Sequence, residues 1–300
     1  MTVESEPAGA SEARPPSAPE SDASGQAYGG GEAPSRTSQV VALARAEFAR
    51  PHTVDGDADA QRRLCAGMQP PPDGWTRPDL IDRTRFFDEQ VLAAIAAGVG
   101  QIVILGAGYD DRALRFRSQG VRYFELDHPT TQADKARRLL TLELDREQLV
   151  PGQPPHPQPT EPTLAPADFR HDDVGAVLAA VDHEANAPSL FICEGLLVYL
   201  DELTIARLLG ALRVRAASGS ALAVSLAVHP DGIDSEHVVN IANALRRTAA
   251  REPWRSILPM AAHTALFAAA GWQLAPGADA APPHGDAAGR RSLFVVARPS

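Results

Sequence analysis

Residues 101–112, Gln-Ile-Val-Ile-Leu-Gly-Ala-Gly-Tyr-Asp-Asp-Arg, decide the fold of this chain. The apolar half predicts a buried strand, and Gly106 and Gly108 predict a tight turn into a helix. A second predicted strand follows at 121–127 and ends in Asp127, at the spacing of a nucleoside-binding βαβ unit. Many strand–helix turns contain glycine for structural reasons alone. The paired acid, which can accept hydrogen bonds from ribose hydroxyls, is what favours a nucleoside.

The residue at position 111 separates two kinds of nucleoside. A dinucleotide fingerprint has glycine or alanine there, whereas this chain has Asp111. A carboxylate in that place would face a pyrophosphate at a helix N-terminus, which is electrostatically unfavourable. We therefore expect a nucleoside without phosphates, and S-adenosylmethionine is the common one. Its cationic groups tolerate nearby acids, and its carboxylate requires an arginine or backbone N–H groups.

The composition indicates an acidic globular protein. The chain has 300 residues, 44% of them hydrophobic, and a formal net charge of −10 at pH 7. Its average surface should repel nucleic acid. The two cysteines, Cys65 and Cys193, match neither a disulfide framework nor a metal-ligand pattern, so no metal is expected. No stretch is apolar for long enough to span a bilayer, and the acidic N-terminus does not resemble a signal peptide. We expect a cytoplasmic protein that binds neither membrane nor nucleic acid.

The order of predicted elements indicates an α/β fold in three segments. Residues 1–34 are rich in Glu, Ser, Ala, Pro and Gly, which predicts a disordered tail. Residues 35–98 predict a helical cap whose first helix begins at the capping residue Ser38. Strands and helices alternate over 99–300, which predicts a doubly wound, Rossmann-like parallel sheet of seven strands. Its last two strands are expected to form an antiparallel hairpin.

Residues 105–115, Leu-Gly-Ala-Gly-Tyr-Asp-Asp-Arg-Ala-Leu-Arg, resemble the LGAGxDxRxxR signature of the leucine carboxyl methyltransferase family. That family includes bacterial polyketide O-methyltransferases similar to the tetracenomycin enzyme. Further runs resemble other motifs of the family in the same order: 123–129 with Lys135 (FExDxP…K), 167–170 (DLR) and 193–200 (EGLLxYL), with 35–37 and 83–88 fitting its helical preface. The resemblance implies that 99–300 is a methyltransferase domain that binds S-adenosylmethionine.

The resemblance also implies a set of cofactor-binding positions. They are Arg83 for the methionine carboxylate, Gly106 and Gly108 for backbone contact, Asp127 for the ribose, Asp168 and Phe169 for the adenine, and Glu194 for the methionine amino group. Each has a structural alternative except Glu194, because an acid directly after an apolar strand must be paired if it is buried. Arg83 could be a solvated helix residue, Asp168 a helix cap and Phe169 part of the core.

The catalytic residue is not evident from the sequence. Methyl transfer from a sulfonium is an in-line displacement that depends mainly on positioning. A carboxylate acceptor is ionised at pH 7 and needs no base, whereas a phenol would benefit from one. His229, which follows a predicted strand, and Tyr199, in the EGLLxYL-like motif, are the candidates. A core tyrosine is the alternative for Tyr199.

Three functions are compatible with these residues. The first is an S-adenosylmethionine-dependent O-methyltransferase that acts on a carboxyl or hydroxyl oxygen of a small molecule, such as a polyketide-like metabolite of secondary metabolism. The second is a nicotinamide-dependent oxidoreductase, disfavoured by Asp111 and by the lack of a Tyr-x-x-x-Lys pair. The third is a catalytically silent nucleoside-binding module. The sequence identifies neither the methyl acceptor nor the oligomeric state.

Overall fold

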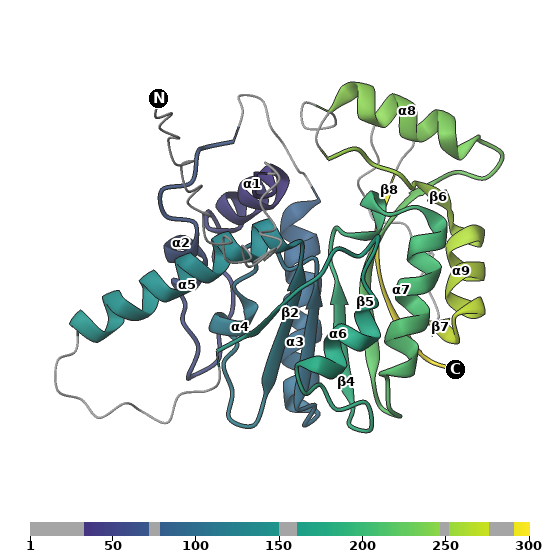
Figure 1. The fold of residues 1–300 in the computed structure, drawn as a ribbon. Coiled ribbons are helices and arrows are strands. Elements are labelled where there is room, and N and C mark those ends of the chain that lie inside the picture. The colour runs from purple at the N-terminus through teal and green to yellow at the C-terminus, as the bar shows by residue number, and fades with distance from the viewer. Residues whose placement is uncertain (1–32, 72–78, 150–160, 247–251, 276–290) are drawn as a thin grey trace, which may run out of the picture. The chain divides into compact units, whose positions relative to one another are not determined.

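A computed structural model describes residues 33–71, 79–149, 161–246, 252–275 and 291–300, and those from Ala33 onward belong to one compact unit (Figure 1). Its helices are α1 (Arg36–Arg45), α2 (Ala60–Leu64), α3 (Leu80–Ala96), α4 (Arg112–Arg115), α5 (Pro129–Leu149), α6 (Val174–Ala180), the 3₁₀ turn η1 (Leu197–Tyr199), α7 (Glu202–Val214), α8 (Ser235–Leu245) and α9 (Met260–Ala269). Its strands are β1 (Gln101–Leu105), β2 (Arg122–Asp127), β3 (Thr163–Pro166), β4 (Ser189–Cys193), β5 (Ala221–His229), β6 (Leu258–Pro259), β7 (Trp272–Leu274) and β8 (Arg291–Pro299). The predicted tail lies outside the described residues up to residue 32.

The strands form one mixed sheet in the order β3-β2-β1-β4-β5-β8-β7. Strands β1 to β5 run parallel to one another, and β8 runs antiparallel to both β5 and β7. The predicted doubly wound α/β fold with a final antiparallel hairpin is therefore confirmed. An eighth strand, β6, pairs with the end of β5. It has two residues, which is too short for a periodic pattern to predict.

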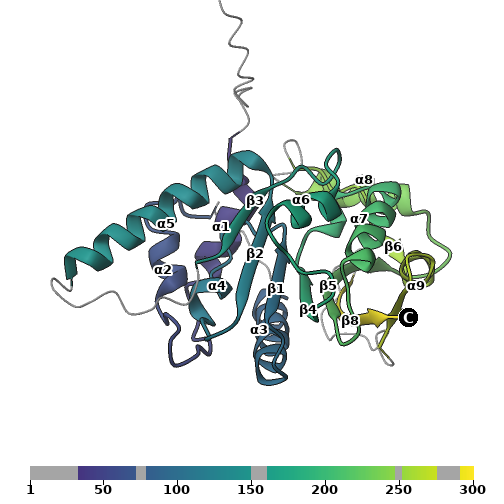
Figure 2. The same cartoon turned by 60° about the horizontal axis from the view of Figure 1, so that its bottom comes forward.

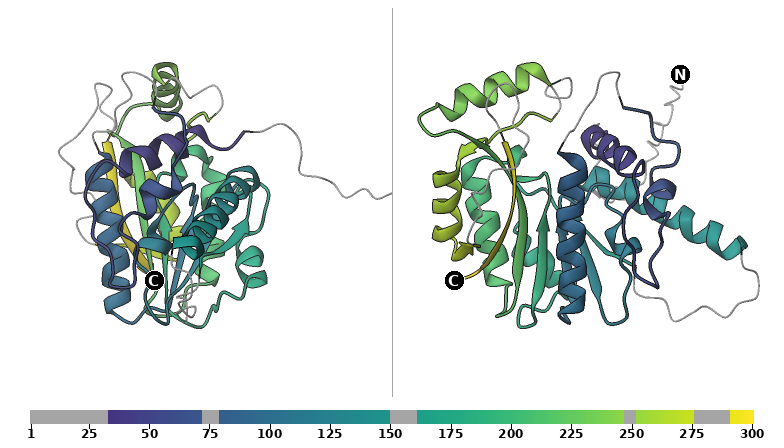
Figure 3. Two further views of the ribbon diagram at one scale, coloured as in Figure 1. Left: turned by 90° about the vertical axis from the view of Figure 1, so that its left-hand side faces the viewer. Right: turned by 180° about the vertical axis from the view of Figure 1, so that it is seen from behind.

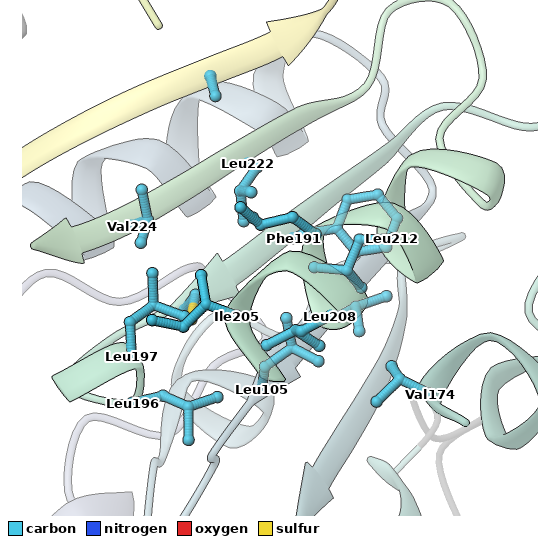
Figure 4. Close-up of a cluster of buried hydrophobic side chains, with 14 of the residues drawn as sticks. Leu105, Val174, Phe191, Leu196, Leu197, Ile205, Leu208, Leu212, Leu222 and Val224 are labelled. Atoms are coloured by element: carbon cyan, nitrogen blue, oxygen red, sulfur yellow. The ribbon is translucent and has the colours of Figure 1, made fainter. Parts of the chain in front are cut away.

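Helices cover both faces of the sheet. Successive residues of a strand point to opposite faces, so neighbouring residues of β1 belong to different clusters. Val103 and Leu105 face a cluster that includes side chains of α6, α7 and α9, part of which Figure 4 shows. Ile102 and Ile104 face a second cluster with residues of α3 and α4. Figure 2 shows α3 on one side of the sheet, with α6 and α7 on the other. The continuous apolar run of β1 follows from this two-sided burial.

The helices that precede the sheet pack closely against it. Phe87 and Val91 of α3 are fully buried against β1 and β4, so α3 is one of the covering helices (Figure 3). Helix α1 begins at Arg36, because Ser35 is its N-cap and accepts a hydrogen bond from the backbone N–H of Ser38. The prediction that Ser38 caps this helix was wrong by one turn.

The carboxyl ends of the parallel strands meet at one edge of the sheet, where ligands of such folds bind. Helices α1 and α8 lie at this edge in Figures 1 and 3. A hydrogen bond from Thr37 N to Glu252 Oε2, 3.2 Å long, links α1 to the segment after α8. Among the described residues, no helix has both the length and the apolar character needed to cross a bilayer.

Candidate functional site

The register of the sheet places four predicted cofactor positions side by side. Leu105 pairs with Leu126 on one side and with Cys193 on the other, so Gly106 lies between Asp127 and Glu194. Ala167 N donates to Asp127 O at 2.8 Å, which brings Asp168 next to Asp127. The order across the edge is therefore Asp168, Asp127, Gly106 and Glu194. Residues that are far apart in the sequence form one row because the strand ends are in register.

The glycine turn has a backbone that only glycine adopts readily. Gly106 has φ +65° and Gly108 has φ +50°, both in the left-handed region. A Cβ on Gly106 would lie 3.2 Å from Leu196 Cδ1, and one on Gly108 would lie 2.8 Å from the side chain of Ser38. Protein side chains therefore lie directly over the turn, and Ser38 brings α1 into contact with it.

Asp127 is fixed to this turn by two backbone donors. Its Oδ2 accepts from Gly108 N at 2.5 Å, and its Oδ1 accepts from His128 N at 2.6 Å. Burial raises the pKa of Asp127, although the two N–H groups favour the ionised form. Each carboxylate oxygen can accept a further hydrogen bond, so the geometry suits a pair of ligand hydroxyls.

A buried arginine network lies beside the row. We use this name for five arginines and four acids whose side chains are at most 7% exposed: Arg45, Arg50, Arg83, Arg112 and Arg115 with Asp88, Asp110, Asp111 and Glu194. They come from α1, from the segment after it, from α3, from the β1–α4 turn and α4, and from the end of β4. Charges this deeply buried are tolerated only when they are paired and hydrogen-bonded.

Arg112 lies at the centre of the arginine network and is fully buried. Its Nε donates to Asp88 Oδ1 at 2.8 Å, and its Nη1 donates to Glu194 Oε2 at 2.8 Å and to Asp110 Oδ2. Its Nη2 donates to Thr84 O at 3.3 Å. One planar guanidinium thus joins α3, the glycine turn and the end of β4, a role that suits arginine's fixed fork of donors.

Glu194 is held by three guanidiniums. Its Oε1 accepts from Arg45 and, at 2.9 Å, from Arg83 Nε, while its Oε2 accepts from Arg112. Burial alone would raise the pKa of Glu194, but the three cations outweigh it and hold the pKa well below its usual range. Glu194 is therefore ionised throughout the neutral pH range, at the edge where the sequence places it.

The structure corrects the sequence argument about Asp111. This side chain does not face the ligand edge; it is fully buried and accepts from Arg50 Nη1 at 2.6 Å and Arg115 Nε at 2.7 Å. Burial opposes its charge, yet the two arginines lower its pKa to about 2. The residue type still departs from a dinucleotide fingerprint, but its role is to pair two buried cations rather than to repel a pyrophosphate.

Comparison with known families shows which family the chain belongs to. The profile described as leucine carboxyl methyltransferase matches residues 40–213, which is more than half of the chain. The chain belongs to the leucine carboxyl methyltransferase family. The match includes the glycine turn, Asp127, Asp168 and Glu194, so it covers the whole row.

Relatives in this family cover part of the chain. A Streptomyces avermitilis protein, provisionally named as an S-adenosyl-L-methionine-dependent methyltransferase, is 33% identical over 59% of this chain and 54% of its own length. A Mycobacterium ulcerans protein with the same provisional name is 34% identical over 72% of this chain and 59% of its own. The chain therefore spans a little over half the length of these curated relatives. A methyltransferase-like crystal structure from Thermobifida fusca is 16% identical, covering 74% of this chain and 82% of its own, with a TM-score of 0.46.

Asp168 and Phe169, the positions predicted for the adenine, lie at one end of the row. Arg170 donates to both oxygens of Asp168, at 3.0 and 2.8 Å, and this hydrogen bonding lowers the pKa of Asp168. Asp168 is not the cap of α6, since Asp173 accepts from the first N–H groups of that helix. Phe169 is half-buried against the core cluster under α6 and α7. Arg83 is 4% exposed, so it is not the solvated residue of the alternative interpretation.

The two candidate catalytic residues lie at the same edge but are engaged by neighbours. His229 Nδ1 lies 2.7 Å from Pro230 O, which can only accept, so Nδ1 carries the proton and Nε2 accepts from Ser235 Oγ at 2.8 Å. Tyr199 OH accepts from Arg246 Nη2 at 3.4 Å. Both side chains are therefore hydrogen-bonded to other described residues, and both ring nitrogens of His229 are engaged.

Sequence reasoning missed the contribution of the first helices. Arg45, Arg50 and Asp88 belong to the arginine network, yet none was a predicted site residue. Asp88 lies in the 83–88 run that resembles the family's helical preface, which was a usable signal. Arg45 and Arg50 lie among apolar residues in a segment with no motif of its own, so only the fold shows which acids their guanidiniums contact.

A second buried ion pair, Lys135 with Glu125, contacts the glycine turn. Lys135, the only lysine of the chain, donates to Glu125 Oε2 and, at 2.7 Å, to Asp110 O of the glycine turn. Both side chains are almost fully buried. Burial raises the pKa of Glu125 to about 7 despite the opposing effect of Lys135. Lys135 thus ties α5 to the end of the turn.

This shift predicts a pH-dependent stability. Between about pH 4.5 and 7, folded Glu125 keeps a proton that the unfolded chain has released. Folding then takes up a proton, so the free energy of unfolding should fall as pH rises through this window. Urea denaturation of wild type and Glu125→Gln at several pH values measures the effect. The wild-type value, relative to the variant, should fall by up to about 3 kcal/mol. Parallel pH profiles for the two proteins would contradict the prediction.

Proposed function

We propose that this protein is an S-adenosylmethionine-dependent O-methyltransferase that acts on a carboxyl or hydroxyl oxygen of a small molecule. The observation that carries the proposal is the row of Asp168, Asp127, Gly106 and Glu194 at the carboxyl edge of a sheet from this family. Its acids are spaced across neighbouring strands, as an extended nucleoside with an amino-acid arm requires.

The residues present fit this cofactor chemically. When bound, S-adenosylmethionine supplies a methyl group on a cationic sulfur. Asp127, anchored through two backbone N–H groups, would hold the ribose hydroxyls, and Asp168 with Phe169 would hold the adenine. The guanidinium of Arg83 would pair with the methionine carboxylate, and the ionised Glu194 with the ammonium group. No phosphate is needed to complete these contacts, which favours this nucleoside over NAD.

The acceptor chemistry follows from the hydrogen bonds of the candidate bases. Because His229 is engaged at both ring nitrogens, an acceptor that is already ionised suits the site better than a phenol that needs a base. The protein's contribution would then be to hold the acceptor oxygen in line with the methyl group and to exclude water. A carboxylate of a polyketide-like metabolite is the acceptor class that we favour.

The segment that selects the acceptor is proposed to lie over η1. Arg255 N donates to Val198 O at 2.7 Å, and Ser256 Oγ donates to Leu197 O at 2.9 Å, so residues after α8 run along the EGLLxYL-like motif. Residues of α8 pack on Val198 as well, so α8 and this segment lie over the η1 turn that follows Glu194. A cytoplasmic location, and the division into a tail (1–34), a helical cap (35–98) and a methyltransferase domain (99–300), belong to the same proposal.

Ligand binding tests the proposed function directly. Isothermal titration calorimetry should give one S-adenosylhomocysteine molecule per chain, with an affinity at least about 100-fold tighter than that for NAD. The reason is that the row offers carboxylates to ribose hydroxyls and an ammonium group, whereas the same carboxylates would repel a pyrophosphate. Binding of NAD without S-adenosylhomocysteine would instead support the oxidoreductase alternative.

A further inference from the structure

Arg45 has one buried N–H group that its two ion pairs do not use. It projects from the last turn of α1 into the arginine network, where it contacts Asp110 through Nη1 at 3.4 Å and Glu194 through Nη2. The residue is only 6% exposed, yet its Nε–H has no acceptor among the described residues. Buried donors of this kind are nearly always satisfied in folded proteins, which points to an acceptor that the chain itself does not supply.

The position of the Arg45 guanidinium relative to Arg83 follows from a shared atom. Arg45 Nη2 and Arg83 Nε both donate to the same oxygen, Oε1 of Glu194. Two nitrogens hydrogen-bonded to one oxygen lie within about 6 Å of each other, which is twice a normal N···O distance. A second carboxylate that pairs with Arg83 is therefore within reach of the guanidinium of Arg45.

We propose that Arg45 is a further cofactor-binding residue and that its guanidinium contacts the amino-acid carboxylate of S-adenosylmethionine together with Arg83. The inference rests on the proposed function and adds to it a residue from α1. Helix α1, which covers the glycine turn through Ser38, would also contribute a cation to the cofactor. Arg45 would then have two roles, since it also holds Glu194.

A ligand that lacks the carboxylate separates these two roles. Binding of S-adenosylhomocysteine and of its decarboxylated analogue, which keeps the ammonium group, should be measured by calorimetry for wild type and Arg45→Met. We expect the substitution to weaken S-adenosylhomocysteine binding by at least about tenfold and to change the affinity for the analogue by less than about threefold. Arg45→Lys, which keeps the charge but has a different donor geometry, should recover part of the lost affinity.

Arg115→Met is the matched control. Arg115 is also buried in the network, but it contacts Asp111 and not Glu194, and Asp111 keeps Arg50 as a partner. This variant should affect both ligands equally. Equal weakening of both ligands by Arg45→Met, or no weakening, would show that Arg45 is only a structural partner of Glu194 and would overturn the inference. If wild type binds neither ligand, the proposed function itself is wrong. If Arg45→Met does not fold, the same two-ligand comparison on Arg45→Lys decides the question.

Discussion

Asp127→Ala is expected to weaken the binding of S-adenosylhomocysteine by at least about 100-fold, because two charge-assisted hydrogen bonds to the ribose, each contributing about 1.5–3 kcal/mol, are lost together. The substitution also leaves Gly108 N and His128 N without their acceptor, which loosens the glycine turn. Calorimetry measures the affinity, and circular dichroism at the same temperature checks that the variant is folded.

Asp127→Asn is the matched control for this prediction. It keeps one side-chain oxygen for the turn but loses the negative charge and one of the two acceptors. Its affinity should fall between those of wild type and Asp127→Ala. Wild-type affinity in Asp127→Ala would show that the ribose lies elsewhere. A turnover assay on wild type separates an enzyme from a silent module, since a silent module binds the ligand with no methyl transfer to lose.

Arg112→Met is expected to lower the free energy of unfolding by about 3–5 kcal/mol. The guanidinium is fully buried and pairs with Asp88, Asp110 and Glu194. Its removal therefore takes one cationic partner away from each of three buried carboxylates. Methionine fills much of the same volume, so the effect reports lost charge pairing rather than a cavity. Urea denaturation followed by circular dichroism gives the value.

Arg137→Met provides the comparison for this measurement. Arg137 lies on α5 with a side chain that is 74% exposed, and its ion pair with Asp134 is within one helix turn. Its substitution should change the free energy of unfolding by no more than about 0.5 kcal/mol. A loss of less than about 1 kcal/mol in Arg112→Met would mean, by the usual cost of breaking a buried pair, that the network is far more hydrated than the structure indicates.

The parts of the site that the sequence predicts are those controlled by local rules. The apolar run of β1, the glycine turn and the acid at the end of β2 are close in sequence, and parallel pairing then brings Glu194 beside them. The motif resemblance added Asp168 and Arg83. These features depend on strand period, turn chemistry and strand order, which the residues express directly.

The environment of Asp111 could not be predicted in the same way. Its partner Arg115 lies one helix turn further on, at the i,i+4 spacing that favours such pairs, but Arg50 comes from a segment about 60 residues earlier, and no sequence rule pairs Arg50 with Asp111. Arg45 is hidden for the same reason, since its role depends on where α1 crosses the sheet edge. Long-range charge pairing is decided by tertiary packing, so the sequence alone suggested a ligand-facing acid where the fold makes an internal one.

The single lysine has a practical consequence for chemical labelling. Lys135 is 1% exposed and its ammonium lies between Glu125 and the carbonyl of Asp110. These 300 residues, when folded, therefore present no lysine side chain to amine-directed cross-linkers or dyes. Any such label found on Lys135 requires that α5 had separated from β2, so the labelling rate measures how often this helix–sheet contact opens.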